Sequence, residues 1–139
     1  MTQDETAAGM NWRREIEELH QFFEGWFLGT EASMQRVESV FAPEMSFVGP
    51  HGVESNRAET LQMIRDGRAH TTQLEIATTD HRLIHHGNDV LVASYVEHHQ
   101  LAESSNRRLS TVVFLPDPEA PNGLAWLRVQ ETWIDSERG

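Results

Sequence analysis

Five of the eight histidines in this chain lie in one short stretch, DHRLIHHGNDVLVASYVEHHQ, which runs from residue 80 to residue 100. Imidazole is a common metal ligand and a general acid or base near neutral pH. The stretch could therefore form a metal site, form a catalytic site, or place imidazoles on the surface of a hairpin.

The expected hairpin disperses these histidines. Gly87-Asn88 is a favourable two-residue turn, which would place His81 opposite Ser94 and Ala77 opposite His98. Neighbouring residues on a strand point to opposite faces, so adjacent histidines cannot share an ion. His81 and His98 share a face but lie roughly 13 Å apart along it, at about 3.3 Å per residue. We expect no metal site, and the alternative that one histidine joins residues of another element stays open.

The composition excludes several other kinds of chemistry. The chain has no cysteine, which excludes disulfides, thiolate nucleophiles and cysteine-ligated metals. It has no lysine, because all 11 basic residues are arginine, so a Schiff base is excluded too. With 22 acidic residues the formal charge is -11, which disfavours nucleic acid and anionic membranes as partners. No cofactor is expected.

The 139 residues suit one domain, which we place at 11–135 between a disordered tail at 1–10 and a short tail at 136–139. The first ten residues are polar and acidic and do not resemble a signal peptide. No apolar run reaches the length of about 18 residues that a membrane span needs. The sequence therefore predicts a cytoplasmic protein.

The first half of the chain has helical periodicity. Apolar residues from Trp12 to Phe27 recur on one helix face, with Glu15 off that stripe, and Gly29 ends the helix. Thr30 or Ser33 could cap a second helix, which should stop at Pro43. A short strand at 45–53 follows, and Asn56 caps a third helix that reaches about Gly67.

The second half has the alternation of strands, in runs at about 72–86, 89–100, 107–115 and 124–134. The predicted fold is therefore α+β, with three N-terminal helices packed on one face of an antiparallel sheet.

Two segments carry a resemblance to a known superfamily. The stretch FAPEMSFVGPHG after the second helix and the closing WLRVQETWI resemble the nuclear transport factor 2-like superfamily, which includes ketosteroid isomerases, SnoaL-like cyclases, scytalone dehydratases and kinase association domains. The resemblance covers about residues 11–134 and implies a cone fold, in which three N-terminal helices pack on a strongly curved antiparallel sheet around an internal pocket. The superfamily mixes enzymes, ligand binders and assembly modules, so the fold does not decide the activity.

The catalytic residues of the isomerases do not carry over to this chain. Counting from shared landmarks, Gly49 occupies the position of the isomerases' aspartate general base. Phe22 occupies the position of their first-helix tyrosine, and Ser110 that of their second oxyanion donor. Gln130 and Trp133 do match the closing strand of such isomerases. If Trp133 faces the pocket, period two places Leu127, Val129 and Glu131 on the same side.

Two titratable residues are the candidates for catalysis. Glu131 lies among apolar residues, where burial would raise its pKa and suit it to general acid or base work; alternatively it pairs with Arg108 or Arg128. His51 follows Gly49-Pro50 near the predicted cavity mouth, but histidines in such turns are commonly simple loop residues. The sequence does not show whether the two meet.

Seven further residues are candidates for contact with a ligand, although an aromatic stripe at helical spacing more often belongs to a core. They are Phe23, Trp26, Phe47, Tyr95, Ser110, Phe114 and Trp133. They suggest a small, largely apolar or amphipathic ligand, and a cofactor-free isomerase, cyclase or dehydratase of the SnoaL-like type.

The alternative function is a non-catalytic dimerisation or association module. The run LVASYV at 91–96 has apolar residues on both faces, whereas a sheet covered on one side alternates more cleanly. A second covering surface is expected, most simply another copy of the chain bound through the sheet.

Overall fold

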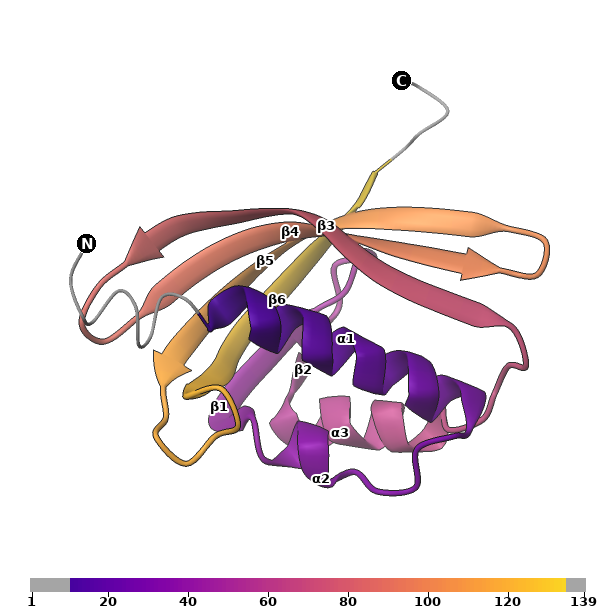
Figure 1. Ribbon diagram of the computed structural model, residues 1–139, viewed down its shortest axis with the longest axis horizontal. Coiled ribbons are helices and arrows are strands. Elements are labelled where there is room, and N and C mark those ends of the chain that lie inside the picture. The colour runs from indigo at the N-terminus through magenta and orange to yellow at the C-terminus, as the bar shows by residue number, and fades with distance from the viewer. Residues whose placement is uncertain (1–10, 135–139) are drawn as a thin grey trace.

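The computed structural model describes residues 11–134, in which three helices lie on one side of a curved sheet (Figure 1). The elements are α1 (Trp12–Leu28), α2 (Gln35–Glu38), β1 (Phe41–Val48), β2 (Glu54–Asn56), α3 (Arg57–Asp66), β3 (Leu74–His86), β4 (Leu91–Leu101), β5 (Ser105–Pro116) and β6 (Leu124–Ile134). The expected α+β architecture is confirmed. The predicted tails at 1–10 and 136–139 lie outside the described residues.

The sheet has six strands in the order β2-β1-β6-β5-β4-β3. Strands β3 to β6 form the predicted antiparallel meander. The expectation of a wholly antiparallel sheet is wrong, because β1 runs parallel to β6. Strand β1 lies beside the last strand of the chain, a long-range pairing that no local pattern indicates.

The second helix is shorter than predicted and ends before Pro43. It covers Gln35–Glu38, and β1 already begins at Phe41. Pro43 is an exposed strand residue at an irregularity in the β1–β6 register. Proline has no backbone N–H to donate to a ladder, so it fits this unpaired position and does not end a helix here.

Helix α1 buries the predicted apolar stripe and ends at Gly29, whose φ of 89° suits glycine. The placement of Glu15 off the stripe is wrong, since this side chain is fully buried. Its carboxylate accepts hydrogen bonds from Arg36, Asn122 and Trp126, at 2.7–3.3 Å. Glu15 thus connects α1 to α2 and to the segment around the start of β6.

The β3–β4 hairpin differs from the predicted one near its tip. Ala77 pairs with His98 as expected, but Ser94 pairs with Arg82 in place of His81. Two irregularities in β3 and a longer connection after His86 account for the difference. Asp80, with a positive φ of 53°, lies within the first irregularity.

Helix α3 begins with a capping box, as its sequence predicts. The Asn56 side chain accepts from the Glu59 backbone N–H at 2.8 Å, and the Glu59 carboxylate accepts from the Asn56 N–H at 2.9 Å. Helix α3 packs on β1 and β2 and so forms one wall of the space beneath the sheet.

None of the helices within residues 11–134 is long and apolar enough to cross a membrane. The cytoplasmic location stays a prediction.

Candidate functional site

A cavity of about 430 Å³ lies between the helices and the sheet. Its walls are mainly apolar and aromatic, with side chains from α1, α3, β1 and β6. Val53 and Met63 line its mouth and are largely exposed, at 68% and 51%. The polar lining includes four ionisable side chains, one each from α1, β4, β5 and β6: His20, Glu97, Arg108 and Glu131.

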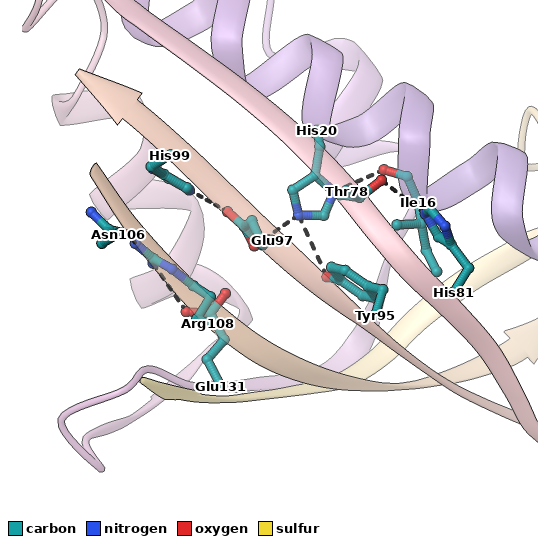
Figure 2. Close-up of polar contacts among 10 residues, drawn as sticks. All are labelled: Ile16, His20, Thr78, His81, Tyr95, Glu97, His99, Asn106, Arg108 and Glu131. Atoms are coloured by element: carbon teal, nitrogen blue, oxygen red, sulfur yellow. Dashed lines mark hydrogen bonds and ion pairs between the residues drawn. The ribbon is translucent and has the colours of Figure 1, made fainter. Parts of the chain in front are cut away.

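Glu97 on β4 lies between two imidazoles (Figure 2). Its Oε1 is 3.0 Å from Nε2 of His20 on α1, and its Oε2 is 2.5 Å from Nε2 of His99. The His20 and Glu97 side chains are only 5% and 7% exposed. Both oxygens of this buried carboxylate are therefore occupied by the protein itself.

The hydrogen bonds of His20 define its protonation. Nδ1 is 2.8 Å from the carbonyl oxygen of Ile16, which can only accept, so Nδ1 carries a proton. Burial favours neutral imidazole, but the Glu97 carboxylate outweighs burial and raises the pKa of His20. Burial also opposes the charge on Glu97, yet His20 and then His99 hold its pKa well below the usual range. The pair is an imidazolium and a carboxylate.

A second pair joins neighbouring strands. Arg108 on β5 donates to Glu131 on β6 at 3.3 Å and to Asn106 at 2.8 Å, and its guanidinium lies 4.7 Å from the ring centre of Trp133. Burial, and then the charge of Glu97, raise the pKa of Glu131 to about 7 despite the attraction of Arg108. Glu131 can thus change between its two forms at neutral pH.

Five of the residues singled out from the sequence line the cavity: Phe23, Phe47, His51, Tyr95 and Glu131. Tyr95 is buried, and burial followed by the Glu97 charge raises its phenol pKa well above 10.0, so the hydroxyl keeps its proton. The predicted pairing of Glu131 with Arg108 is also present.

His51 and Glu131 lie on the same cavity but show no direct contact with each other among the interactions of residues 11–134. His51 packs edge-on against Trp133, with ring centres 5.8 Å apart. Trp133 in turn contacts Arg108. His51 therefore approaches the Arg108–Glu131 pair through the Trp133 ring.

The other four predicted ligand contacts lie outside the cavity lining. Trp26 donates from Nε1 to the Ile64 carbonyl at 2.6 Å and so ties α1 to α3. Phe114 and Ser110 are fully buried, and the Ser110 hydroxyl has no hydrogen-bond partner within the described part of the chain. Trp133 is 41% exposed at the rim.

The predicted inward face of β6 needs one correction. Val129 and Glu131 line the cavity as expected, but Leu127 does not. The register between β5 and β6 skips Leu127, because Val113 pairs with Arg128 and Phe114 pairs with Trp126. The irregularity lets Trp126 take the inward position.

The sequence reasoning missed His20, Glu97 and His99 as site residues. His20 and Glu97 lie 77 positions apart, so neither local spacing nor periodicity connects them. One usable signal is an acid at the end of the otherwise apolar run LVASYVE, because a buried carboxylate requires a partner.

The histidines of residues 80–100 are dispersed, as the hairpin argument expects. His99 reaches the cavity, while His98 contacts Thr79 and His81 contacts Thr78. His99 thus fulfils the alternative left open from the sequence, because it joins α1 through Glu97. Between residues 11 and 134 no three His, Asp or Glu side chains are arranged to hold one metal ion.

The arrangement is suited to binding and to proton transfer. An apolar enclosure with a few convergent polar groups is typical of small-molecule sites. Glu131 has a pKa near the working pH, which favours general acid or base chemistry.

Comparisons with known proteins agree with this architecture. A nuclear transport factor 2-like protein of unknown function from Pseudomonas aeruginosa is 29% identical with a TM-score of 0.81, over 89% of this chain and 98% of that one. The hub of the kinase CaMKII from S. rosetta is 14% identical with a TM-score of 0.71, over 91% and 95% of the two chains. The superfamily resemblance and the cone fold are confirmed.

The sequence also matches a more specific family. A curated relative, probable sucrose-phosphatase 3a of Arabidopsis thaliana, is 26% identical over 140 residues, which cover 96% of this chain and 33% of the relative. The chain thus spans about a third of the length of that protein. Residues 13–135 match the family described as sucrose-6-phosphate phosphohydrolase C-terminal. This nuclear transport factor 2-like chain belongs to the sucrose-6-phosphate phosphohydrolase C-terminal family.

Proposed function

We propose that this chain binds a small, largely apolar molecule in its cavity and moves a proton on that molecule without a cofactor. The observation that carries the proposal is the position of Glu131, a carboxyl that titrates near neutrality, on the wall of an enclosed apolar cavity. Carboxyl groups whose pKa is strongly raised by burial are concentrated at functional sites.

The size of the cavity supports a molecule larger than water or a simple ion. Its volume of about 430 Å³ lies within the range of roughly 300–1,000 Å³ that small-molecule sites occupy. The rings of Phe23, Phe27 and Phe47 line it, and such walls bind apolar rings or chains. The exposed Val53 and Met63 side chains would contact the outer end of such a ligand.

The chemistry that Glu131 suits is proton transfer beside a carbonyl group. The ionised carboxylate takes the proton from the carbon, and the electron pair of the C–H bond moves toward the carbonyl oxygen to give an enolate. Glu131 then returns a proton to the ligand, either at the same carbon or at another position. Isomerisation, cyclisation and dehydration all begin with or include such a step. We propose His51, at the same cavity, as the second titratable participant.

Binding is tested with N-phenyl-1-naphthylamine, an uncharged apolar dye that fluoresces when it leaves water. We expect the dye to bind the wild type and to bind Val129→Phe at least tenfold more weakly, because Val129 faces into the cavity. The matched control is Val113→Phe on the opposite face of the sheet. Equal binding to all three proteins would contradict the proposed site.

Proton transfer is tested by exchange of hydrogen for deuterium next to the carbonyl of octan-2-one in D₂O, followed by NMR. We expect exchange above the protein-free rate with the wild type, and its loss in Glu131→Gln. His51→Ala tests the second participant in the same assay. Dye binding without any exchange, over a panel of cyclic and linear ketones, would reduce the function to binding.

The name of the Arabidopsis relative suggests a protein that acts on a sugar phosphate, and this chain matches only a third of it. Sucrose therefore belongs in the binding panel. Displacement of the dye by sucrose, and not by ketones, would show that the ligand is a polyol and not an apolar molecule.

We propose homodimerisation through the sheet as the second candidate function. Figure 1 shows the helices on one side of the sheet, and no helix of residues 11–134 covers the other side. The outward positions of β4, β5 and β6, which we call the outer patch, follow from their register: Val92, Ser94, Val96, His98, Arg107, Leu109, Thr111, Val113, Arg128, Gln130 and Thr132. Leu109 is 47% exposed within it.

A further inference from the structure

The ionised side chains of the cavity are already paired with one another. The His20–Glu97 pair joins α1 to β4 at 3.0 Å, and the Arg108–Glu131 pair joins β5 to β6 at 3.3 Å. All four side chains are no more than 15% exposed. A charge at this depth is tolerated only where an opposite charge or several hydrogen bonds compensate it.

The first pair has no capacity left for a charged ligand. Glu97 uses Oε1 for His20 and Oε2 for His99, and His20 uses Nδ1 for the Ile16 carbonyl and Nε2 for Glu97. Since the imidazolium and the carboxylate cancel, the pair presents no net charge. Tyr95, 3.4 Å from His20 Nε2, adds a neutral hydroxyl.

The second pair is unfavourable to a further charge of either sign. A ligand anion next to Glu131 would meet the same burial, and the same Glu97 carboxylate, that make ionisation of Glu131 itself costly. A ligand cation would be desolvated beside the permanently charged Arg108 guanidinium. While Glu131 is ionised, as at pH 8, the cavity therefore has no uncompensated charge that an ionised ligand could neutralise.

We infer that this cavity selects uncharged ligands that carry a carbonyl or hydroxyl oxygen and rejects ionised analogues of the same shape. This inference rests on the proposed binding function and names its ligand class. A ligand hydroxyl can donate to Oε2 of Glu131, which accepts no hydrogen bond within residues 11–134. A ligand carbonyl can accept from the Arg108 guanidinium, whose Nε–H has no hydrogen-bond partner in the same part of the chain. Neither group brings a charge into the cavity. The apolar walls hold the remainder of the molecule.

Three eight-carbon probes with different head groups test the inference: octan-2-one, octanoate and octylamine. At pH 8 octanoate is an anion and octylamine is a cation, while the apolar chains are nearly the same. Each probe is titrated against bound N-phenyl-1-naphthylamine. We expect octan-2-one to displace the dye at a concentration at least tenfold lower than either charged probe needs.

A charge-altering variant makes the same test independent of probe solubility. Glu131→Gln removes the partner of Arg108 while keeping the shape of the side chain, so the cavity gains an uncompensated positive charge. In this variant the preference for octan-2-one over octanoate should fall at least tenfold. The control Glu75→Gln, an exposed residue of β3, should keep the wild-type preference.

The two proposals fail in different ways. If a charged probe displaces the dye from the wild type as well as octan-2-one does, or if octan-2-one does not displace it, the selectivity for uncharged ligands is overturned while dye binding still supports a ligand site. If the dye itself does not bind the wild type, the proposed function fails and the ligand class with it. An unchanged preference in Glu131→Gln also contradicts the charge argument.

Discussion

Glu131 should make the protein less stable as the pH rises. Its pKa is about 7 in the folded chain, above the ordinary value of 4.5 that applies after unfolding. Below pH 4.5 the group is protonated in both states, and between these pH values unfolding releases a proton. The free energy of unfolding therefore falls as the pH rises between these values. The fall is complete above pH 7 and amounts to about 3 kcal/mol for this pKa difference.

The first prediction follows from this linkage. Glu131→Gln, which keeps an oxygen for Arg108 but cannot ionise, should be more stable than the wild type by about 2–3 kcal/mol at pH 8.5. At pH 5 the two proteins should differ by less than about 1 kcal/mol. Urea unfolding at the two pH values measures this, with Glu75→Gln as the exposed control. A difference that does not depend on pH would show that Glu131 has an ordinary pKa.

Ionised Glu97 should stabilise the folded protein, in contrast to ionised Glu131, because its charge compensates that of His20. Glu97→Gln leaves the His20 imidazole buried without its carboxylate, which should cost about 3 kcal/mol in urea unfolding near pH 6. The pair contributes most between the ordinary carboxyl and imidazole pKa values, 4.5 and 6.5, where both groups are charged in the folded and the unfolded chain.

NMR titration of His20 provides the readout that a general packing defect would not change. In Glu97→Gln the pKa of His20 should fall below that of the wild type, since burial then acts without the opposing charge. The exposed Glu75→Gln variant should leave it unchanged. A wild-type pKa for His20 in Glu97→Gln would disprove the ion pair.

The predictability of single residues depends on how far apart their partners lie in the chain. Strand periodicity places Glu131 on the inner face once the superfamily resemblance orients Trp133 toward the pocket, and Arg108 on the preceding strand is one of two basic candidates for it. His20 and Glu97 are joined only by the packing of α1 on the sheet, so their pairing cannot be read from spacing. Leu127 is absent from the cavity because the β5–β6 register is irregular at this residue. No local sequence pattern indicates that irregularity.

At the scale of elements, the cavity wall formed by α3 depends on the helix start at Asn56. Asn56→Ala removes the side-chain half of the capping box and should lower stability by about 1 kcal/mol in urea unfolding. Asn56→Ser, which can still accept from the Glu59 N–H, should recover most of that loss. A loss of equal size in both variants would mean that the cap does not stabilise the helix.

The elements that the sequence predicts well are those with local signals. The capping residue of α3, the glycine that ends α1 and the alternation in β3 to β6 each reflect the backbone of their own segment. The sequence predicts a helix for the segment around Phe41, because Val37, Val40 and Phe41 fit a helical face as well as a strand. Pairing of this segment with the distant β6 decides the outcome, and no local propensity reports that contact.

At the scale of the molecule, the outer patch differs from the rest of the chain in charge. The chain has 22 acidic residues and a formal charge of -11, which should keep copies apart in dilute salt. Yet none of the outer-patch positions is acidic, and Arg107 and Arg128 lie at its margins. At one of these margins Arg128 pairs with Glu54 of β2 at 3.1 Å. A surface of apolar side chains with no acidic position of its own is suited to a second copy of an acidic chain.

The last prediction is that the protein is a dimer at micromolar concentration and that Leu109→Asp weakens the dimer at least tenfold. Leu109 is 47% exposed on the outer patch, and a carboxylate there would be desolvated in both copies at once. Sedimentation velocity measures the equilibrium, with Val53→Asp at the cavity mouth as a control of equal charge change. Added salt should strengthen the wild-type dimer, because it screens the repulsion between two chains of charge -11. A wild-type monomer at high salt, or equal weakening by both variants, would remove the sheet as the dimer interface and leave the cavity as the functional surface of this chain.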